Sequence, residues 1–287
     1  MTTGSDTAGA SPGFRPLTAR RIYAFLSTNA FTARGLYLNL GYWPRAGGID
    51  EACEALVELI GETAGMGPGD EVVDVGFGFA DQDMFWLRRF APRRIIGFNV
   101  TPAQVRIARA RLRRMGLAGR IDLREGSATQ LPLPDASCDV VTAVECAFHF
   151  DTRERFFAEA FRVLRPGGRL VLADVIPAAP PPGPLRRRGR DFLWNAAAIS
   201  FAIPAANAYP RDIYRDKLAA PGFGNVQVTS IRDQVFPGWH RAVMEDAALR
   251  RRLRLSGWLA DFLLRHLDED AIYRAFDYVL ASARKPA

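Results

Sequence analysis

The sequence predicts an α/β fold, in which a doubly wound and mostly parallel seven-stranded sheet carries a helical N-terminal segment and lid insertions. Between residues 71 and 174, short apolar runs alternate with amphipathic stretches, which is typical of parallel strands covered by helices on both faces. The first of these runs ends in a glycine turn. With 287 residues, 48% of them hydrophobic, the chain can bury one large core and still carry a lid.

The expected strands are short and apolar, as strands buried in a parallel sheet are. Five lie at 71–75, 94–99, 121–125, 139–144 and 169–174, and two more follow at 225–232 and 277–284. The clearest helix start is Thr101, because threonine suits the N-cap, Pro102 suits the first turn, and Gln104 completes a capping box. Another helix is expected at 153–164, ended by the glycines before the fifth strand.

One domain is expected from residue 18 to residue 287, after a disordered tail at 1–17. Within it we expect a helical N-terminal cap (18–65), a cofactor-binding core (66–176) and lid or substrate elements (177–220 and 234–270). The tail is small and polar without an apolar core, so it does not resemble a signal peptide. No apolar run reaches the length of a membrane span.

Composition and charge argue against several function classes. The net charge of +7 comes almost entirely from scattered arginines, with Lys217 and Lys285 as the lysines, and this bias does not predict a nucleic-acid partner. The three cysteines form no C-x-x-C pair, so neither a disulfide framework nor a zinc site is expected. We therefore expect a cytoplasmic protein without a nucleic-acid or membrane partner. The sequence defines no oligomeric state.

The glycine turn after the first strand is the first sign of a ligand site. Asp74, Gly76 and Gly78 form a D-x-G-x-G pattern, in which glycine lets the backbone approach a ligand and the following helix start offers free N–H groups. An NAD site would need a third glycine at the position of Asp81, whose carboxylate suits a pyrophosphate poorly. The turn therefore favours a cofactor without phosphates.

Further motifs follow the glycine turn in order, and together they resemble class I S-adenosylmethionine-dependent methyltransferases, which have a Rossmann-like fold. These motifs are Gly97-Phe98-Asn99, Gly126-Ser127-Ala128 and Leu164-Arg165-Pro166-Gly167-Gly168. Segments around the core resemble the antibiotic-tailoring branch that includes erythromycin-type sugar O-methyltransferases: 38–43, 82–86, Glu145-x-x-x-His149 and 278–280. The resemblance implies S-adenosyl-L-methionine as cofactor and a small molecule as acceptor.

The resemblance also assigns cofactor contacts. The residues implied are Asp74, Gly76 and Gly78 at the methionine half, Asn99 and Thr101 at the ribose with Gln104 in reach, and Ser127 and Ala128 at the adenine. Asn99 and Ser127 replace acids that are common in the family, so weaker ribose binding and adenine recognition by backbone groups are expected. Tyr37 and Trp43 either close over the sulfonium, since aromatic faces attract cations, or pack the N-terminal helices.

Two residues after the fourth strand are candidates for proton transfer. His149 is the preferred general base, because it falls at the carboxyl edge of the sheet and imidazole in an ordinary environment titrates at about pH 6 to 7. Glu145 either holds the ammonium group of the cofactor or acts as a base. Glu145 and Asp174 end neighbouring strands, but this pattern is too common to predict a metal.

The acceptor pocket is expected to be lined by His240 and by aromatic residues of the lid. These are Phe192, Trp194, Phe201, Tyr209 and Tyr214, and the alternative is that they seal the lid to the sheet. The favoured function is O-methylation of a hydroxyl on a glycosylated polyketide or similar secondary metabolite. One alternative is C-methylation of an isoprenoid, with or without a diphosphate, or of an aromatic acceptor, with Glu145 as base. Another is a cofactor-binding accessory or regulatory protein without turnover.

Overall fold

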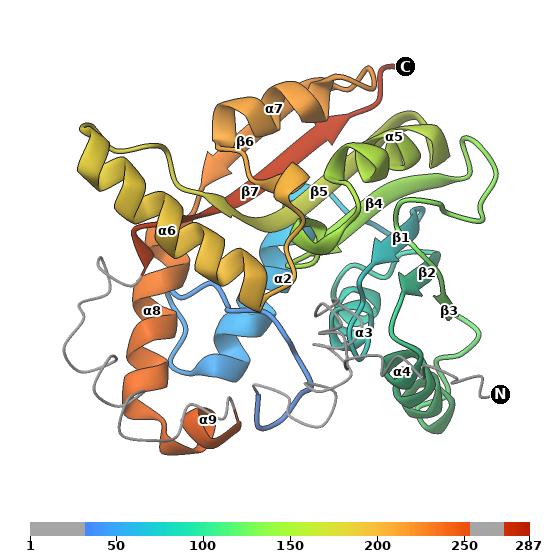
Figure 1. Cartoon of the computed structure of the whole chain (residues 1–287). Coiled ribbons are helices and arrows are strands. Elements are labelled where there is room, and N and C mark those ends of the chain that lie inside the picture. Colours follow the sequence, from blue (N-terminus) through green and yellow to red (C-terminus); the bar gives the residue numbers. More distant parts are fainter. Residues whose placement is uncertain (1–31, 253–272) are drawn as a thin grey trace, which may run out of the picture.

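The computed structural model describes residues 32–252 and 273–287 and contains a central seven-stranded sheet (Figure 1). The strands are ordered β3-β2-β1-β4-β5-β7-β6. β7 runs antiparallel to both β5 and β6, and the other neighbouring pairs are parallel. The predicted doubly wound, mostly parallel α/β fold is therefore confirmed.

Each predicted strand is present near its expected position. The strands are β1 (Glu71–Val75), β2 (Arg94–Asn99), β3 (Ile121–Glu125), β4 (Cys138–Val144), β5 (Leu164–Pro177), β6 (Gly224–Ser230) and β7 (Phe276–Arg284). The helices are α2 (Ile49–Thr63), α3 (Asp81–Arg89), α4 (Pro102–Arg114), α5 (Arg153–Val163), α6 (Pro184–Ser200), α7 (Arg211–Ala219), α8 (Arg232–Glu245) and α9 (Ala247–Arg252), with short 3-10 turns η1 (Ala147–His149) and η2 (Ala205–Asn207). No helix among the described residues is long and apolar enough to cross a bilayer.

Helices cover both faces of the sheet because successive strand residues point to opposite sides. Val72 of β1 belongs to the core cluster formed with α2, α3, α4 and α8, whereas Val73 belongs to the cluster formed with α5 and α7. β1 and β4 are buried over most of their length at the centre of the sheet. Their carboxyl ends are therefore fixed by packing from both sides.

β5 begins at Leu164, the residue predicted to end the preceding helix, and runs through the predicted turn at 165–168. Leu164 pairs with Cys138, and the register then shifts before Arg169 pairs with Val140. Gly167 adopts a φ of +77°, a left-handed conformation that glycine reaches without strain. The glycines at this point therefore form a bulge within the strand and do not delay its start.

The N-terminal segment differs from the helical cap expected at 18–65. Within the described residues it forms α2, while 32–48 is irregular. The Asp50 carboxylate holds the irregular part by accepting hydrogen bonds from the backbone N–H groups of residues 33 to 35. The expected tail at 1–17, the first part of the cap and the end of the second lid element, from residue 253, lie outside the described residues.

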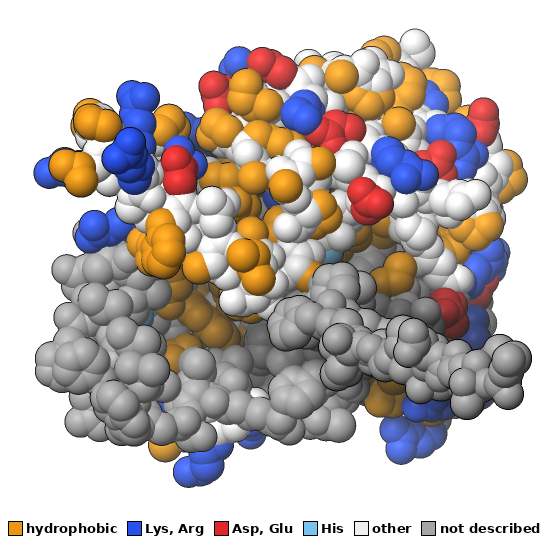
Figure 2. All heavy atoms as spheres, in the orientation of Figure 1, with side chains coloured by type: hydrophobic (Ala, Val, Ile, Leu, Met, Phe, Trp, Pro, Cys, Tyr) orange, Lys and Arg blue, Asp and Glu red, His pale blue; other side chains and the backbone are white. Residues whose placement is uncertain are grey.

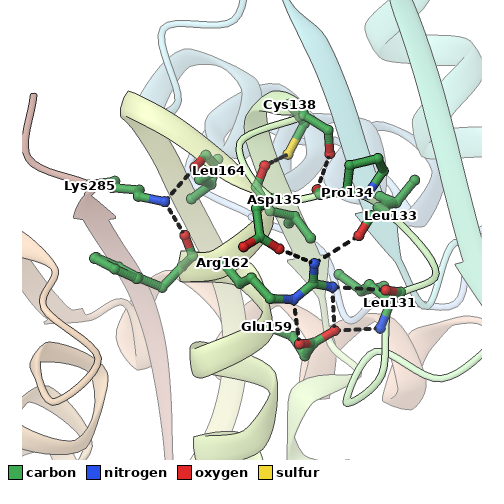
Figure 3. A network of polar contacts seen from close by, with 12 residues as sticks. Leu131, Leu133, Pro134, Asp135, Cys138, Glu159, Arg162, Leu164 and Lys285 are labelled. Carbon is green, nitrogen blue, oxygen red and sulfur yellow. Dashed lines mark hydrogen bonds and ion pairs between the residues drawn. The ribbon is translucent and has the colours of Figure 1, made fainter.

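A polar network around Arg162 of α5 fixes the connection between β3 and β4 (Figure 3). The guanidinium donates hydrogen bonds to the carboxylates of Glu159 and Asp135 and to the carbonyl oxygens of Leu131 and Leu133. Glu159 also accepts a hydrogen bond of 2.6 Å from the Leu131 N–H. The planar fork of arginine can serve these acceptors together, whereas the ammonium of lysine cannot.

Arg162→Lys should therefore lower the free energy of unfolding by about 1 to 3 kcal/mol, because at least one buried carbonyl loses its donor. Urea unfolding followed by circular dichroism measures this change. Arg89→Lys, which alters an exposed ion pair with Glu58, is the matched control, and its effect should stay within about 0.5 kcal/mol. Equal effects in both variants would show that Arg162 acts as a surface charge and does not fix the connection.

Candidate active site

A cavity of about 260 Å³ opens at the carboxyl edge of the sheet, beside the ends of β1, β2 and β4. β1 lies between β2 and β4, so the chain leaves β1 and β4 toward opposite halves of the sheet, and a crevice forms where the strand order reverses. The predicted site residues that line it are Tyr37, Gly76, Gly78, Asn99, Gln104, Ser127, Ala128, Glu145 and His149. The structure thus brings together residues from five separate segments of the chain.

The glycine turn forms one wall of this cavity. Gly76 and Gly78 both adopt left-handed backbone conformations, with φ values of +76° and +55°. A Cβ atom on Gly76 would lie 2.6 Å from the Cys146 sulfur, so no larger residue fits there without a shift. The turn therefore exposes backbone, and not side chains, to a ligand.

Asp74 lies beneath the glycine turn and does not line the cavity, contrary to the predicted cofactor contact. Its side chain is fully buried and accepts hydrogen bonds from Thr142 Oγ1 at 2.7 Å and from Gln82 Nε2 at 2.8 Å. Burial raises the pKa of Asp74 to about 7, and these two hydrogen bonds oppose the shift. The carboxyl group therefore supports the turn from below.

Asn99 and Gln104 form an amide pair in the part of the cavity lining that follows β2. Asn99 Oδ1 accepts a hydrogen bond of 2.9 Å from the Thr101 N–H, and Asn99 Nδ2 donates one of 2.9 Å to Gln104 Oε1. The predicted capping box is therefore wrong: Thr101 is the N-cap of α4, but its side chain makes no capping bond. Thr101 is buried and does not line the cavity. Its backbone N–H, and not its side chain, bonds to Asn99.

Ser127 and Ala128, which the resemblance assigns to the adenine, line the cavity after β3. The Ser127 hydroxyl accepts a hydrogen bond of 3.2 Å from the Thr129 N–H and lies 2.9 Å from Thr129 Oγ1. Because this side chain is engaged within its own turn, the backbone of the turn is left to meet a ligand.

Glu145 follows β4 in a left-handed conformation with a φ of +49°, which is uncommon for a residue with a side chain. Its Oε1 accepts hydrogen bonds from the Leu40 N–H at 2.6 Å and from the Tyr278 hydroxyl at 2.5 Å. Burial raises the pKa of Glu145 to about 7, although both hydrogen bonds lower it. Glu145 therefore fastens the segment 36–39, which forms a further wall of the cavity.

His149 ends η1 at the rim of the cavity. Burial lowers its pKa to about 4, because the imidazolium is poorly solvated there; Arg153 lowers it further, and hydrogen bonding to the backbone of Ala202 and Phe201 opposes the shift. The expectation that His149 titrates at about pH 6 to 7 assumed an ordinary, solvated environment, and the His149 ring is buried instead. At neutral pH the ring is neutral and can accept a proton.

Comparison with known proteins agrees with this geometry. Residues 73–172 match the family described as Methyltransferase domain. The chain is 38% identical to the erythromycin 3''-O-methyltransferase of Saccharopolyspora erythraea, over 91% of this chain and 88% of that protein. The chain belongs to the class I S-adenosylmethionine-dependent methyltransferases. It is an enzyme of this class, with S-adenosylmethionine as methyl donor.

Two other similarities extend the comparison of this methyltransferase. It is 29% identical to the 27-O-demethylrifamycin SV methyltransferase of Amycolatopsis mediterranei, over 88% of this chain and 91% of that protein. A geranyl diphosphate C-methyltransferase from Streptomyces coelicolor has a TM-score of 0.69 at 18% sequence identity, covering 97% of this chain and 100% of that chain. The second similarity shows a shared fold.

The cavity of the methyltransferase fits its cofactor in chemistry. Gln104 Nε2 is buried and has no hydrogen-bond partner among the described residues, so a ligand hydroxyl can accept from it. At Gly76 a side chain would collide with Cys146, which keeps the backbone bare. The unpaired Gln104 Nε2 donor suits a ribose hydroxyl. The bare backbone at Gly76 suits the amino-acid part of the cofactor.

Glu145 and Asp174, the carboxylates at the carboxyl ends of β4 and β5, are both bonded to other groups of the methyltransferase. Asp174 pairs with Arg153 at 2.8 Å, and both side chains are fully buried, while Glu145 is held by Leu40 and Tyr278. Across residues 32–252 and 273–287 no three His, Cys, Asp or Glu side chains are grouped as metal ligands would be.

The buried lid aromatics of the methyltransferase, Trp194, Tyr209 and Tyr214, do not line the cavity. Tyr209 and Tyr214 are buried around Arg153, and Trp194 packs on Phe276. This is the sealing role that the sequence left as the alternative.

The remaining candidates of the methyltransferase are also outside the cavity lining. Phe192 and Phe201 are 72% and 54% exposed, and apolar and arginine side chains gather over α6 (Figure 2). Trp43 packs against Gly238 of α8 and donates a hydrogen bond to the Leu40 carbonyl, and His240 packs against Tyr273. The irregular course of 32–48 carries Trp43 away from the glycine turn while Tyr37 stays beside it.

Sequence reasoning missed several cavity residues of the methyltransferase. Leu36, Gln82, Cys146, Phe150 and Asp151 also line the cavity. Cys146 and Phe150 could have been found, because they directly follow Glu145 and His149 on a short turn after a strand. Leu36 could also have been found, because it directly precedes Tyr37, which the resemblance places beside the cofactor.

A pH-dependent effect on stability is expected from Asp83, which is fully buried below the glycine turn with no partner for either oxygen among the residues described. Burial, and then the neighbouring Asp74, raises the pKa of Asp83. Above about pH 4 an unfolded aspartate releases its proton while the folded one keeps it, so the wild type loses stability as pH rises. Asp83→Asn should therefore gain stability relative to the wild type between about pH 4 and pH 7, by up to about 1.4 kcal/mol per pH unit.

Urea unfolding of both proteins across this pH range measures the difference. Glu62→Gln, at an exposed position of α2, controls for the loss of one acidic group. A pH dependence for Asp83→Asn no steeper than that of Glu62→Gln would contradict a raised pKa at Asp83.

Proposed function

We propose that this methyltransferase transfers a methyl group to a hydroxyl of a glycosylated polyketide or similar secondary metabolite. The observation that carries the proposal is the single cavity that brings the glycine turn, the Asn99–Gln104 pair, Glu145 and His149 together. Both O-methyltransferase relatives act on antibiotic compounds according to their names, which supports the class of acceptor.

In this proposal the cofactor would bind in this cavity, and the acceptor would bind beside it. The backbone at Gly76 and Gly78 and the Asn99–Gln104 pair would hold the cofactor. When bound, S-adenosylmethionine supplies a methyl group on a sulfonium, a strong electrophile. The protein then has to align the acceptor oxygen, exclude water and remove its proton.

Proton removal is assigned to His149 in this proposal. Its lowered pKa keeps the ring neutral at pH 7, so the basic form is fully populated, although the base is weaker than an ordinary histidine. Glu145 lines the same cavity, and its second oxygen, Oε2, has no hydrogen bond from a described residue. Glu145 carries the alternative proposal, C-methylation of an isoprenoid or aromatic acceptor.

The diphosphate form of this alternative has less support. A diphosphate would need arginine partners near the cavity. Arg186, Arg187 and Arg188 are exposed on α6, and neither they nor Arg211 line the cavity. A cofactor-binding accessory role without turnover is the further alternative, and transfer of label to an acceptor distinguishes it. We also propose a cytoplasmic setting without a nucleic-acid or membrane partner.

Cofactor binding should depend on the Gln104 amide. Gln104→Leu should weaken binding of S-adenosylhomocysteine by about five- to tenfold, because the orphan donor and the bond to Asn99 are lost together. Calorimetry measures the affinity. Gln130→Leu, an exposed change in a neighbouring turn, is the control. Unchanged affinity in Gln104→Leu would place the ribose elsewhere.

Turnover should depend on His149. His149→Gln should lower kcat by about a hundredfold or more, with little change in cofactor affinity, as expected when a general base is removed. Transfer of labelled methyl to a panel of hydroxylated macrolide and aromatic acceptors measures the rate. Near-normal turnover in His149→Gln, combined with loss of turnover in Glu145→Gln, would support the C-methylation alternative instead.

A further inference from the structure

The short segment that carries His149 is held by its neighbours on both sides. The Phe148 N–H donates a hydrogen bond of 3.1 Å to Asp174 Oδ1. The carbonyl oxygens of Phe148 and Phe150 both accept hydrogen bonds from Asn207 Nδ2, at 3.0 Å and 2.7 Å. Two side chains thus fix the backbone immediately before and after His149.

Asn207 and Asp174 belong to one buried network that is centred on Arg153. The Arg153 guanidinium donates hydrogen bonds to the Asp174 carboxylate at 2.8 Å and to the Asn207 backbone carbonyl. The Arg153 backbone N–H donates a hydrogen bond of 3.1 Å to Asn207 Oδ1. All three residues are fully buried. Breaking such a network leaves a charge or a polar group without a partner, so its geometry is strongly favoured.

Asn207 reaches this network from the connection between α6 and α7, where it ends η2. The same connection supplies the backbone groups of Phe201 and Ala202 that hydrogen-bond with His149. One connection therefore contacts both the backbone around His149 and its ring. A displacement of the connection would displace His149 as well.

We propose that Asn207 is a positioning residue for His149, which ties the orientation and solvation of the imidazole to the connection between α6 and α7. The catalytic meaning of this proposal rests on the proposed function, in which His149 removes the acceptor proton. Asn207 itself does not line the cavity, so it acts through the histidine segment and touches neither cofactor nor acceptor.

Asn207→Ala tests the proposal, because it removes both donors to the carbonyls that flank His149. Asn207→Ser is a milder variant, whose hydroxyl can still donate to one of them. The matched control is Tyr214→Phe. Tyr214 is fully buried in the same network and donates a hydrogen bond of 3.2 Å to Asp174, but it makes no hydrogen bond to 148–150.

The first readout is the titration of the His149 ring, followed by nuclear magnetic resonance. The chain has three histidines, so the His149 signal is assigned by its absence in His149→Gln. The charged and titratable groups around the ring segment are Arg153 on α5, Asp174 on β5, and Glu145 and Asp151 beside it in the cavity lining, and all the variants retain them. The wild-type signal should titrate below about pH 5, and in Asn207→Ala its midpoint should rise by one pH unit or more toward about 6.5, because water reaches the ring.

The second readout is kinetic. Asn207→Ala should lower kcat by about tenfold or more while affinity for S-adenosylhomocysteine changes by less than about threefold, and Asn207→Ser should fall between Asn207→Ala and the wild type. Tyr214→Phe should lower stability without moving either readout.

The proposal and the proposed function fail in different ways. If both Asn207 variants match Tyr214→Phe in titration midpoint and in kcat, Asn207 is a structural residue and the proposal is wrong, even where His149→Gln is inactive. If the midpoint moves in Asn207→Ala but His149→Gln retains turnover, Asn207 positions His149 and the base lies elsewhere.

Discussion

The parallel pairing of β1 with β2 on one side and β4 on the other is the constraint on which the site depends. The parallel pairing of neighbouring strands continues past the strand ends through single backbone bonds. The Gly76 N–H extends the β1–β2 pair to the Phe98 carbonyl, the Gly126 N–H extends the β2–β3 pair to the Asn99 carbonyl, and the Glu145 N–H extends the β4–β5 pair to the Ala173 carbonyl. The turns that form the cavity walls are therefore extensions of the sheet, and their relative positions follow from its register.

Buried polar groups concentrate around this edge, and the carboxyl groups that have partners there are satisfied in two ways. Arg153 and Asp174 balance each other as an ion pair, whereas Asp74 and Glu145 accept hydrogen bonds from neutral donors and have raised pKa values. A site with little water strengthens electrostatic interactions and makes an unpaired charge costly. Neither Asp74 nor Glu145 forms an ion pair with a described residue, and burial is the main cause of both raised pKa values.

The sequence predicted the sheet and nine of the residues that line the cavity, because those features depend on local patterns. Strand ends, glycine turns and their order identified Gly76, Asn99, Ser127 and Glu145. It did not predict which partner a polar side chain would choose: Gln104 bonds to Asn99 instead of capping its helix, and Asp74 turns into the core. Nor did it place the lid aromatics, because packing between segments distant in sequence decides whether Tyr214 meets a ligand or Arg153.

The contacts of Glu145 have a consequence for the order in which the protein folds during synthesis. One partner, Leu40, precedes it by 105 residues, and the other, Tyr278, follows it by 133. The strand that carries Tyr278 also inserts between β5 and β6. A nascent chain that ends before β7 can form the glycine turn, but its Glu145 lacks the hydrogen bond from Tyr278, so this anchor of the wall at 36–39 is added only after β7 has left the ribosome.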